Sequence, residues 1–143
     1  DIVNALSAQY PEKHQDFKAN YDALIHDIDQ IAVKADSVLS RKQHKVFLIY
    51  LPALTYFAKD YGMEQISIEH EGKEPGPAHL KEVIDLIGEK YIRMILIQNQ
   101  FDVNNAQSVA KQTGIEVIPI DPLSPEWLTE MNTLIGIFDT KLN

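Results

Sequence analysis

Asp121 is the carboxylate whose place in the sequence best suits chemistry. It directly follows the apolar run at 117–120 and precedes Pro122, whose ring restricts the local backbone. A carboxylate there could ligate a metal cation, because ligands meet this kind of sheet at the ends of its strands. An Asp before a Pro-Leu-Ser segment also commonly caps a turn or a helix. The spacing alone favours the capping role and leaves the metal role open.

The histidines do not form a recognisable metal-binding pattern. There are five, His14, His26, His44, His70 and His79, and no two stand at a ligand spacing such as i, i+4. We expect His14, His26 and His79 to be solvated helix residues. His70 has a glutamate on either side within a polar loop, so it could attract a cation, although hydration is the commoner fate of such a loop.

Three common kinds of active site are absent from the sequence. A phosphate-binding loop needs glycines after the first strand, whereas residues 50–54 read Tyr-Leu-Pro-Ala-Leu. A receiver domain needs acidic residues at the ends of its first and third strands, where this chain has Leu51 and Gln98. A serine hydrolase needs a serine on a sharp turn, and no Gly-x-Ser-x-Gly segment occurs. We therefore expect no enzymatic activity.

The composition is that of an ordinary globular domain with an acidic surface. Of 143 residues, 45% are hydrophobic and 24% are charged, which suits one packed core. The 21 acidic and 13 basic residues give a formal net charge of -8. That balance argues against nucleic-acid binding, which requires a basic surface. The absence of cysteine excludes disulfides and Cys-based zinc sites.

No targeting or membrane-spanning segment is recognisable in the sequence. No run approaches the roughly 20 apolar residues needed to cross a bilayer. The opening Asp1-Ile2-Val3-Asn4 lacks a basic region followed by an apolar run, so the chain shows no signal peptide. If the parent protein is exported, we expect its targeting segment to lie upstream.

Short apolar runs alternate with helical patterns over most of the chain. Strands are predicted at 46–50, 66–68, 92–97 and 117–120, and helices at 12–39, 52–61, 78–90, 103–113 and 126–141. Because the strands are apolar on both faces, we expect a four-stranded parallel sheet covered on both sides. The fold class is therefore α/β, a three-layer sandwich, preceded by one long helix that should pack on the sheet.

In this fold class, ligands bind in loops at the carboxyl ends of the strands. Those loops are 51–52, 69–77, 98–102 and 121–125. Asp121 opens the last of them, so the fold prediction places it where a ligand could be met.

Several segments, taken in order, resemble one family of binding proteins. They are 50–62 (YLPALTYFAKDYG), 66–69 (ISIE), 74–77 (EPGP), 98–101 (QNQF) and 120–123 (IDPL), with 4–6 (NAL), 11–12 (PE) and Tyr21 near the start. Segment 50–62 is similar to the family pattern His-x-Ala-Phe-x-Tyr-Phe-Ala-x-x-Tyr-Gly, and segment 74–77 to Glu-Pro-Ser-Pro. The family comprises the solute-binding proteins of ABC importers that capture zinc or manganese. The resemblance covers nearly the whole chain.

The resemblance implies a division of the chain and a setting for its parent. Family members have two α/β lobes joined by a rigid helix, with the metal held between the lobes. Residues 1–10 would be the end of that interlobe helix. Residues 11–143 would be the C-terminal lobe, with the long helix at 12–39 and βα repeats at 45–143. The parent would work outside the cytoplasm, periplasmic or lipid-anchored, and would deliver Zn²⁺ or Mn²⁺ to an ABC permease.

The resemblance also assigns metal ligands position by position. The fourth ligand of the family falls on Asp121, and the third, a His or Glu in relatives, falls on Leu51. Leucine has no lone pair, and the other two ligands belong to the first lobe, which is missing here. One carboxylate cannot make a four-coordinate zinc site. The resemblance therefore implies that the parent captures metal while this chain alone is metal-incompetent.

Two other interpretations stay open at this point. The chain could be an engineered or degenerate α/β scaffold or interaction domain without a transport function, or, with less support, an enzyme of flavodoxin-like architecture. The loops that would face the missing lobe could expose an apolar cleft face, formed by Leu51, Pro52, Phe101, Pro122 and Leu123. Such a patch could mediate weak self-association, unless Leu51 turns inward and fills the core.

Overall fold

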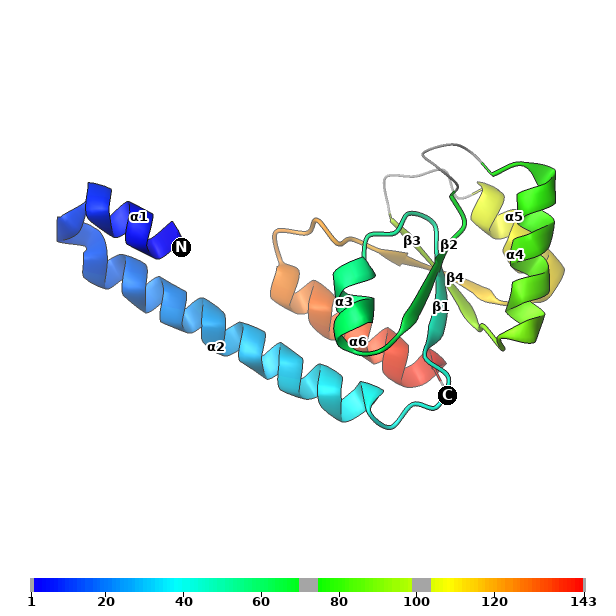
Figure 1. The fold of residues 1–143 in the computed structure, drawn as a ribbon, viewed down its shortest axis with the longest axis horizontal. Helices are drawn as coiled ribbons and strands as arrows, with labels where there is room; N and C mark the ends of the chain where they lie inside the picture. The colour runs from blue at the N-terminus through cyan, green and yellow to red at the C-terminus, as the bar shows by residue number, and fades with distance from the viewer. Residues whose placement is uncertain (1, 70–74, 99–103, 143) are drawn as a thin grey trace.

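The computed structural model describes residues 2–69, 75–98 and 104–142 (Figure 1). The elements, in chain order, are α1 (Ile2–Gln9), the 3-10 turn η1 (Pro11–Lys13), α2 (His14–Leu39), β1 (Val46–Ile49), α3 (Thr55–Asp60), β2 (Glu64–Ser67), α4 (Pro77–Glu89), β3 (Met94–Gln98), α5 (Asn104–Thr113), β4 (Glu116–Ile120) and α6 (Trp127–Lys141). The predicted fold class is confirmed, since four parallel strands alternate with helices after one long helix.

The sheet has the strand order β2-β1-β3-β4, and every neighbouring pair is parallel. The chain first moves from β1 to β2 on one side and then crosses to the other side of β1 to form β3. In open α/β sheets, ligands bind next to the point where the strand order reverses in this way. The loop after β1 and the end of β3 therefore flank the expected binding edge.

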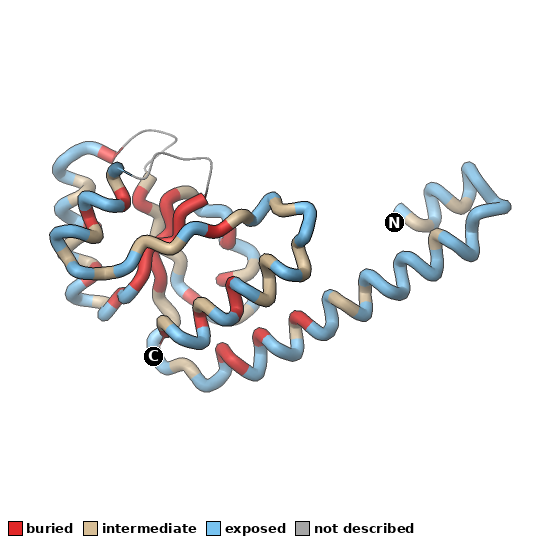
Figure 2. The backbone as a smooth tube through the Cα atoms, turned by 180° about the vertical axis from the view of Figure 1, so that it is seen from behind, coloured by how far each residue is buried: buried red, intermediate tan, exposed pale blue. Residues whose placement is uncertain are grey.

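Helices cover both faces of the sheet and bury a separate apolar core on each face (Figure 2). Alternate residues along β1 and just after it point to opposite faces, so Phe47 and Ile49 enter one core while Leu48 and Tyr50 enter the other. The first core is closed by α2, α3 and α6, and the second by α4 and α5. All five residues of β3 are buried, because this strand is covered on both faces and paired on both edges.

The long helix predicted at 12–39 is present as α2, and it packs on the body of the fold through its last third. Its buried residues are Ile31, Ala35, Val38 and Leu39. Leu24, in the first half, remains 45% exposed, and this half projects beyond the sheet (Figure 1). A helix of 26 residues is about 39 Å long, whereas a strand of five residues spans only about 17 Å.

The first half of α2 pairs instead with α1, which runs antiparallel beside it (Figure 1). The turn between the two helices is η1, and Nδ1 of His14 lies 2.9 Å from the hydroxyl oxygen of Ser7. Neither these helices nor any other helix in the described residues combines the length and apolarity needed to cross a membrane.

Two of the shifts between predicted and observed boundaries are explained by backbone hydrogen bonds. The helix expected at 52–61 begins only at Thr55, since the chain first makes a turn in which the Ala53 N–H donates to the carbonyl of Leu51 (2.7 Å). The strand expected at 66–68 begins at Glu64, whose N–H donates to the carbonyl of Lys45 (2.7 Å). Side-chain periodicity does not encode either bond.

Replacing leucines at two places in α2 tests this division of the helix. Leu39→Ala removes a side chain that is 1% exposed, so we expect it to lower the free energy of unfolding by about 2–5 kcal/mol. Leu24→Ala is the matched control, and because that side chain is 45% exposed its cost should be about 1 kcal/mol or less. Urea titrations followed by circular dichroism give both values. Equal losses would contradict the described packing.

Candidate functional site

The carboxyl edge of the sheet carries Leu51 and Asp121 at the ends of two different strands. The register pairs Gln98 of β3 with Ile120 of β4, and the backbone of Leu51 bonds the side chain of Gln98. Because β3 lies between β1 and β4, strand spacing separates the backbones at Leu51 and Asp121 by about 10 Å. Two long side chains directed across the end of β3 could therefore share one small ligand.

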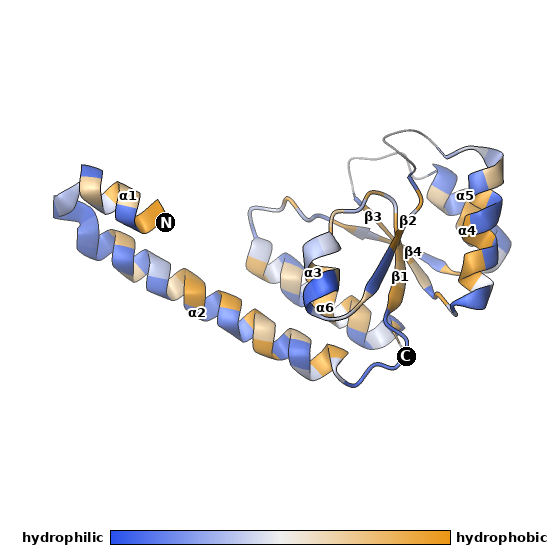
Figure 3. Cartoon of the chain, in the orientation of Figure 1, coloured by the Kyte–Doolittle hydropathy of each residue, from blue (hydrophilic) through white to orange (hydrophobic). Residues whose placement is uncertain are grey.

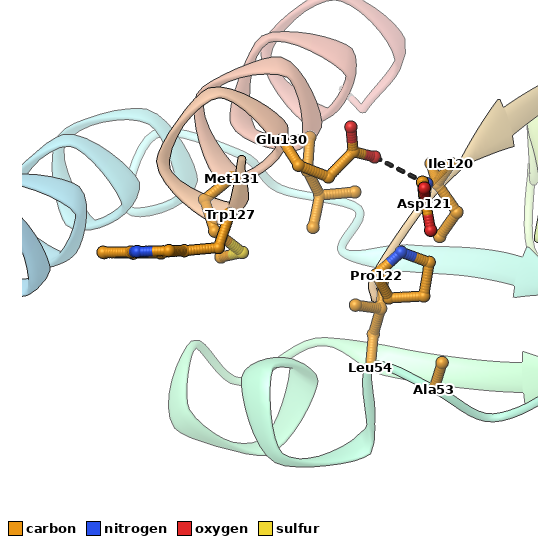
Figure 4. Close-up of a pocket in the computed structure, with 9 residues that line it drawn as sticks. Ala53, Leu54, Ile120, Asp121, Pro122, Trp127, Glu130 and Met131 are labelled. Carbon is orange, nitrogen blue, oxygen red and sulfur yellow. Dashed lines mark hydrogen bonds between the residues drawn. The ribbon is translucent and has the colours of Figure 1, made fainter. Parts of the chain in front are cut away.

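Asp121 is held at this edge by hydrogen bonds on both sides of its peptide unit. Its N–H donates to Oε1 of Glu130 (2.7 Å), the bond drawn in Figure 4. Its carbonyl accepts from the N–H of Ser124 (3.0 Å), and its carboxylate Oδ1 accepts from the N–H of Leu123 (3.3 Å). The last bond is an Asx turn, which is the capping role that the sequence favours. The residue is only partly buried, so the carboxylate can still meet a cation from solvent.

A small cavity of about 150 Å³ lies between the end of β4, α6 and the residues that precede α3 (Figure 4). Its wall is largely apolar and includes Leu54, Trp127 and Met131. Asp121 and Glu130 supply the carboxylates, and Glu130 stands in the first turn of α6, where a negative charge interacts favourably with the helix dipole. An occupant of this cavity would meet two acidic groups beside an apolar wall.

Position 51 carries a side chain that cannot ligate a metal. Leu51 is partly buried and packs against the core beneath α4 and α5, so the structure favours the inward orientation over an exposed one. Its backbone is bonded twice by the side-chain amide of Gln98. In the sequence, Gln98 is noted only because the third predicted strand ends in it rather than in the acidic residue that a receiver domain needs. The signal that could have found it is a polar residue that ends an otherwise apolar central strand.

The described histidines do not converge on this edge. His14 and His26 are exposed on α2, as expected, and His44 lies in the connection before β1. His79 is partly buried on α4, with Nδ1 3.5 Å from a carboxylate oxygen of a glutamate in the next turn. His70 and its glutamate neighbour at 71 lie outside the described residues. Within 2–69, 75–98 and 104–142, no three His, Asp or Glu side chains form a group that could hold a metal ion.

Comparison with known proteins connects this edge to a family. Residues 1–143 match the family model described as "ZnuA: Zinc-uptake complex component A periplasmic". The chain belongs to the ZnuA family. It is 30% identical over 137 residues to the zinc-binding lipoprotein AdcA of Streptococcus pneumoniae, covering 94% of this chain and 27% of that protein.

Two further relatives of the ZnuA family extend the comparison. The high-affinity zinc uptake system protein ZnuA of Haemophilus influenzae is 26% identical over 127 residues, covering 85% of this chain and 37% of that protein. A crystal structure of ZnuA has a TM-score of 0.93 with this fold at 26% identity, covering 98% of this chain and 55% of that one. The chain thus spans roughly a quarter to a half of the length of the relatives it matches.

The match confirms the resemblance that the motifs along the chain indicate. The ZnuA family is one of zinc-binding solute-binding proteins and not of enzymes. The solved structure confirms the α/β architecture, including the long helix before the sheet. The ligand roles of positions 51 and 121 remain predictions.

Removing the Glu130 carboxylate tests how it supports the Asp121 backbone. Glu130→Ala should lower the free energy of unfolding by about 1–2 kcal/mol, because a hydrogen bond to a charged, partly buried acceptor is lost. Glu126→Ala is the control, since that side chain is exposed near the start of the same helix and makes no cap bond. Comparing the two variants cancels the shared helix-dipole contribution. A difference under about 0.5 kcal/mol in chemical denaturation would show that the bond adds no stability.

Proposed function

We propose that this chain is the C-terminal lobe of a zinc-binding substrate-binding protein that serves an ABC importer. The match of the whole chain, residues 1–143, to the ZnuA family model is the observation that carries the proposal. The names of two relatives, a zinc-binding lipoprotein and a high-affinity zinc uptake protein, support zinc rather than manganese as the substrate. Asp121 adds a partly exposed carboxylate at the edge where ligands bind in this fold class.

In the longer protein, the metal would be held by Asp121 together with ligands from outside this chain. A zinc site of this kind needs about four nitrogen, oxygen or sulfur ligands. Position 51, to which the family pattern assigns a ligand, carries a leucine without a lone pair. Asp121 cannot complete the coordination by itself, so we expect this chain alone to bind Zn²⁺ or Mn²⁺ more weakly than about 1 µM.

Residues 1–10 are proposed as the end of a helix that joins this lobe to a missing N-terminal lobe. α1 carries no charged residue and no buried one. Ile2, Val3, Tyr21 and Leu24 line an apolar groove between α1 and α2, and Figure 3 shows apolar positions continuing along α2. A face of this kind is typical of a surface that another part of a protein covers. Residues 11–143 would then be the C-terminal lobe.

The family also supports a setting outside the cytoplasm, in the periplasm or on a lipid anchor. The family description names the periplasm, and AdcA is named as a lipoprotein. An ABC permease would receive the metal from the complete protein. The formal net charge of -8 suits a partner that is a cation and gives no support to a nucleic-acid partner.

A second role, as an interaction domain that self-associates weakly through the cleft face, has one observation in its favour. Leu123 is 83% exposed at the carboxyl edge, and Pro52 and Pro122 are exposed in loops at the same edge. Leu51 packs inward and Phe101 lies outside the described residues, so the described patch is smaller than the sequence suggests. Burying one leucine contributes only about 1.5–3 kcal/mol, which corresponds to a dissociation constant above about 1 mM.

Calorimetry with zinc tests the ligand assignment. We expect the unchanged chain to show no site tighter than about 1 µM. Leu51→His should strengthen zinc binding at least about tenfold, because a polar imidazole, unlike leucine, is disfavoured in the apolar core and gains by turning to the solvent-facing edge, where it restores a ligand. Leu51→Phe is the control, because it adds a ring without a lone pair. Combining Leu51→His with Asp121→Ala should abolish the gain if the two side chains share the ion. A stoichiometric nanomolar site in the unchanged chain would overturn the proposed metal incompetence.

Sedimentation equilibrium at about millimolar protein concentration tests the cleft face. Leu123→Ser should reduce any self-association, because it removes the most exposed apolar side chain at the carboxyl edge. Val33→Ser is the matched control, since Val33 is 67% exposed on α2, away from that edge. If both variants associate as the unchanged chain does, the cleft face is not an interface between copies.

A further inference from the structure

Gln98, the last residue of β3, places an amide in the interior at the carboxyl edge. It is 3% exposed, and among the described residues it is the one polar side chain that is buried. It follows Leu96 and Ile97, which lie in opposite cores. Burying an amide without hydrogen bonds costs stability, so a glutamine in this place needs dedicated partners.

Both polar atoms of this amide meet the backbone of Leu51. Oε1 accepts from the Leu51 N–H (3.4 Å), and Nε2 donates to the Leu51 carbonyl (2.9 Å). Just after β1, a backbone bond joins the N–H of Tyr50 to the carbonyl of Leu96 in β3 (2.9 Å). The side chain of Gln98 adds one more rung beyond this bond, because an amide can both donate and accept.

A second glutamine braces the same loop farther along the chain. Gln65 belongs to β2, on the opposite side of β1 from β3. Its Oε1 accepts from the N–H of Leu54 (3.0 Å), and its Nε2 donates to Oγ1 of Thr55 (2.9 Å). The loop after β1 is thus held from both neighbouring strands, and each glutamine contacts a different part of it.

We propose that Gln98 is a positioning residue that fixes the backbone of position 51, and so the direction of its side chain, relative to Asp121. Holding the N–H and the carbonyl of one residue restrains the peptide units on both sides of its Cα. Gln98 also pairs in register with Ile120, which directly precedes Asp121. The backbones at position 51 and at Asp121 are therefore both placed by contacts with Gln98. The consequence for metal binding rests on the proposed function, whereas the consequence for the backbone rests on the geometry alone.

Amide hydrogen exchange and NMR chemical shifts test the backbone role without a metal. Gln98→Met keeps the length of the side chain and removes both polar atoms. Exchange of the Leu51 N–H should accelerate at least about tenfold more than that of the β1 amides, and the carbonyl carbon shift of Leu51 should move. Gln65→Met is the matched control, which should affect the Leu54 N–H and leave Leu51 unchanged.

If the Leu51 amide responds to Gln98→Met no more than the β1 amides do, Gln98 only fills the core and the positioning role is wrong. Should Gln98→Met not fold, Gln98→Asn supplies the same comparison. The shorter side chain keeps the amide but withdraws it from Leu51 by one methylene, so the same acceleration is expected.

Zinc binding in a Leu51→His background measures the consequence for metal. There, adding Gln98→Met should weaken binding by about tenfold, as is typical when a group that orients a ligand is removed, while Gln65→Met should change it far less. If Leu51→His binds no zinc, the proposed ligand role of position 51 fails, and hydrogen exchange still decides the role of Gln98. If Leu51→His binds zinc equally well whether or not Gln98→Met is added, the positioning role fails and the proposed function stands.

Discussion

The burial of β3 on both faces is the constraint on which the rest of the structure depends. All five of its residues are buried, and its two edges pair with β1 and β4. Polar groups on a strand covered in this way must be satisfied inside the protein, so the backbone requires both neighbouring strands and the terminal amide of Gln98 requires Leu51. Helices must then cover both faces, which leaves the carboxyl edge as the place where polar side chains can act.

That edge is shaped by bonds between side chains and backbone groups that are distant in sequence. Gln65 and Gln98 hold the loop after β1, and Glu130 holds the loop after β4 through the N–H of Asp121. The positions of Leu51 and Asp121 therefore follow from the fold as a whole and not from their own loops. On the proposed function, this chain keeps the frame of a metal site while supplying one ligand to it.

The sequence could predict the sheet because its apolar runs specify strands that are buried on both faces, and the end of the fourth run placed Asp121 at the carboxyl edge. It could not predict how much of α2 meets the body of the fold, since an apolar stripe does not reveal what covers it. Leu24 and Leu39 both belong to the helix predicted at 12–39, yet only Leu39 is buried. Gln98 was missed for a different reason, because its partner is 47 residues away and becomes a neighbour only once the strand order is known.

α2 and α6 lie side by side although most of the chain separates them. Nζ of Lys42, just after α2, donates to the carbonyl of Leu142, 100 residues later (3.0 Å). The core beneath the two helices includes Phe47 and Phe138, so during synthesis it cannot close until α6, a helix of 15 residues, has left the ribosome. The opposite core draws mostly on β1 to α5, which emerge earlier. One face of the nascent sheet can thus be covered first, while the other stays open to aggregation until α6 emerges.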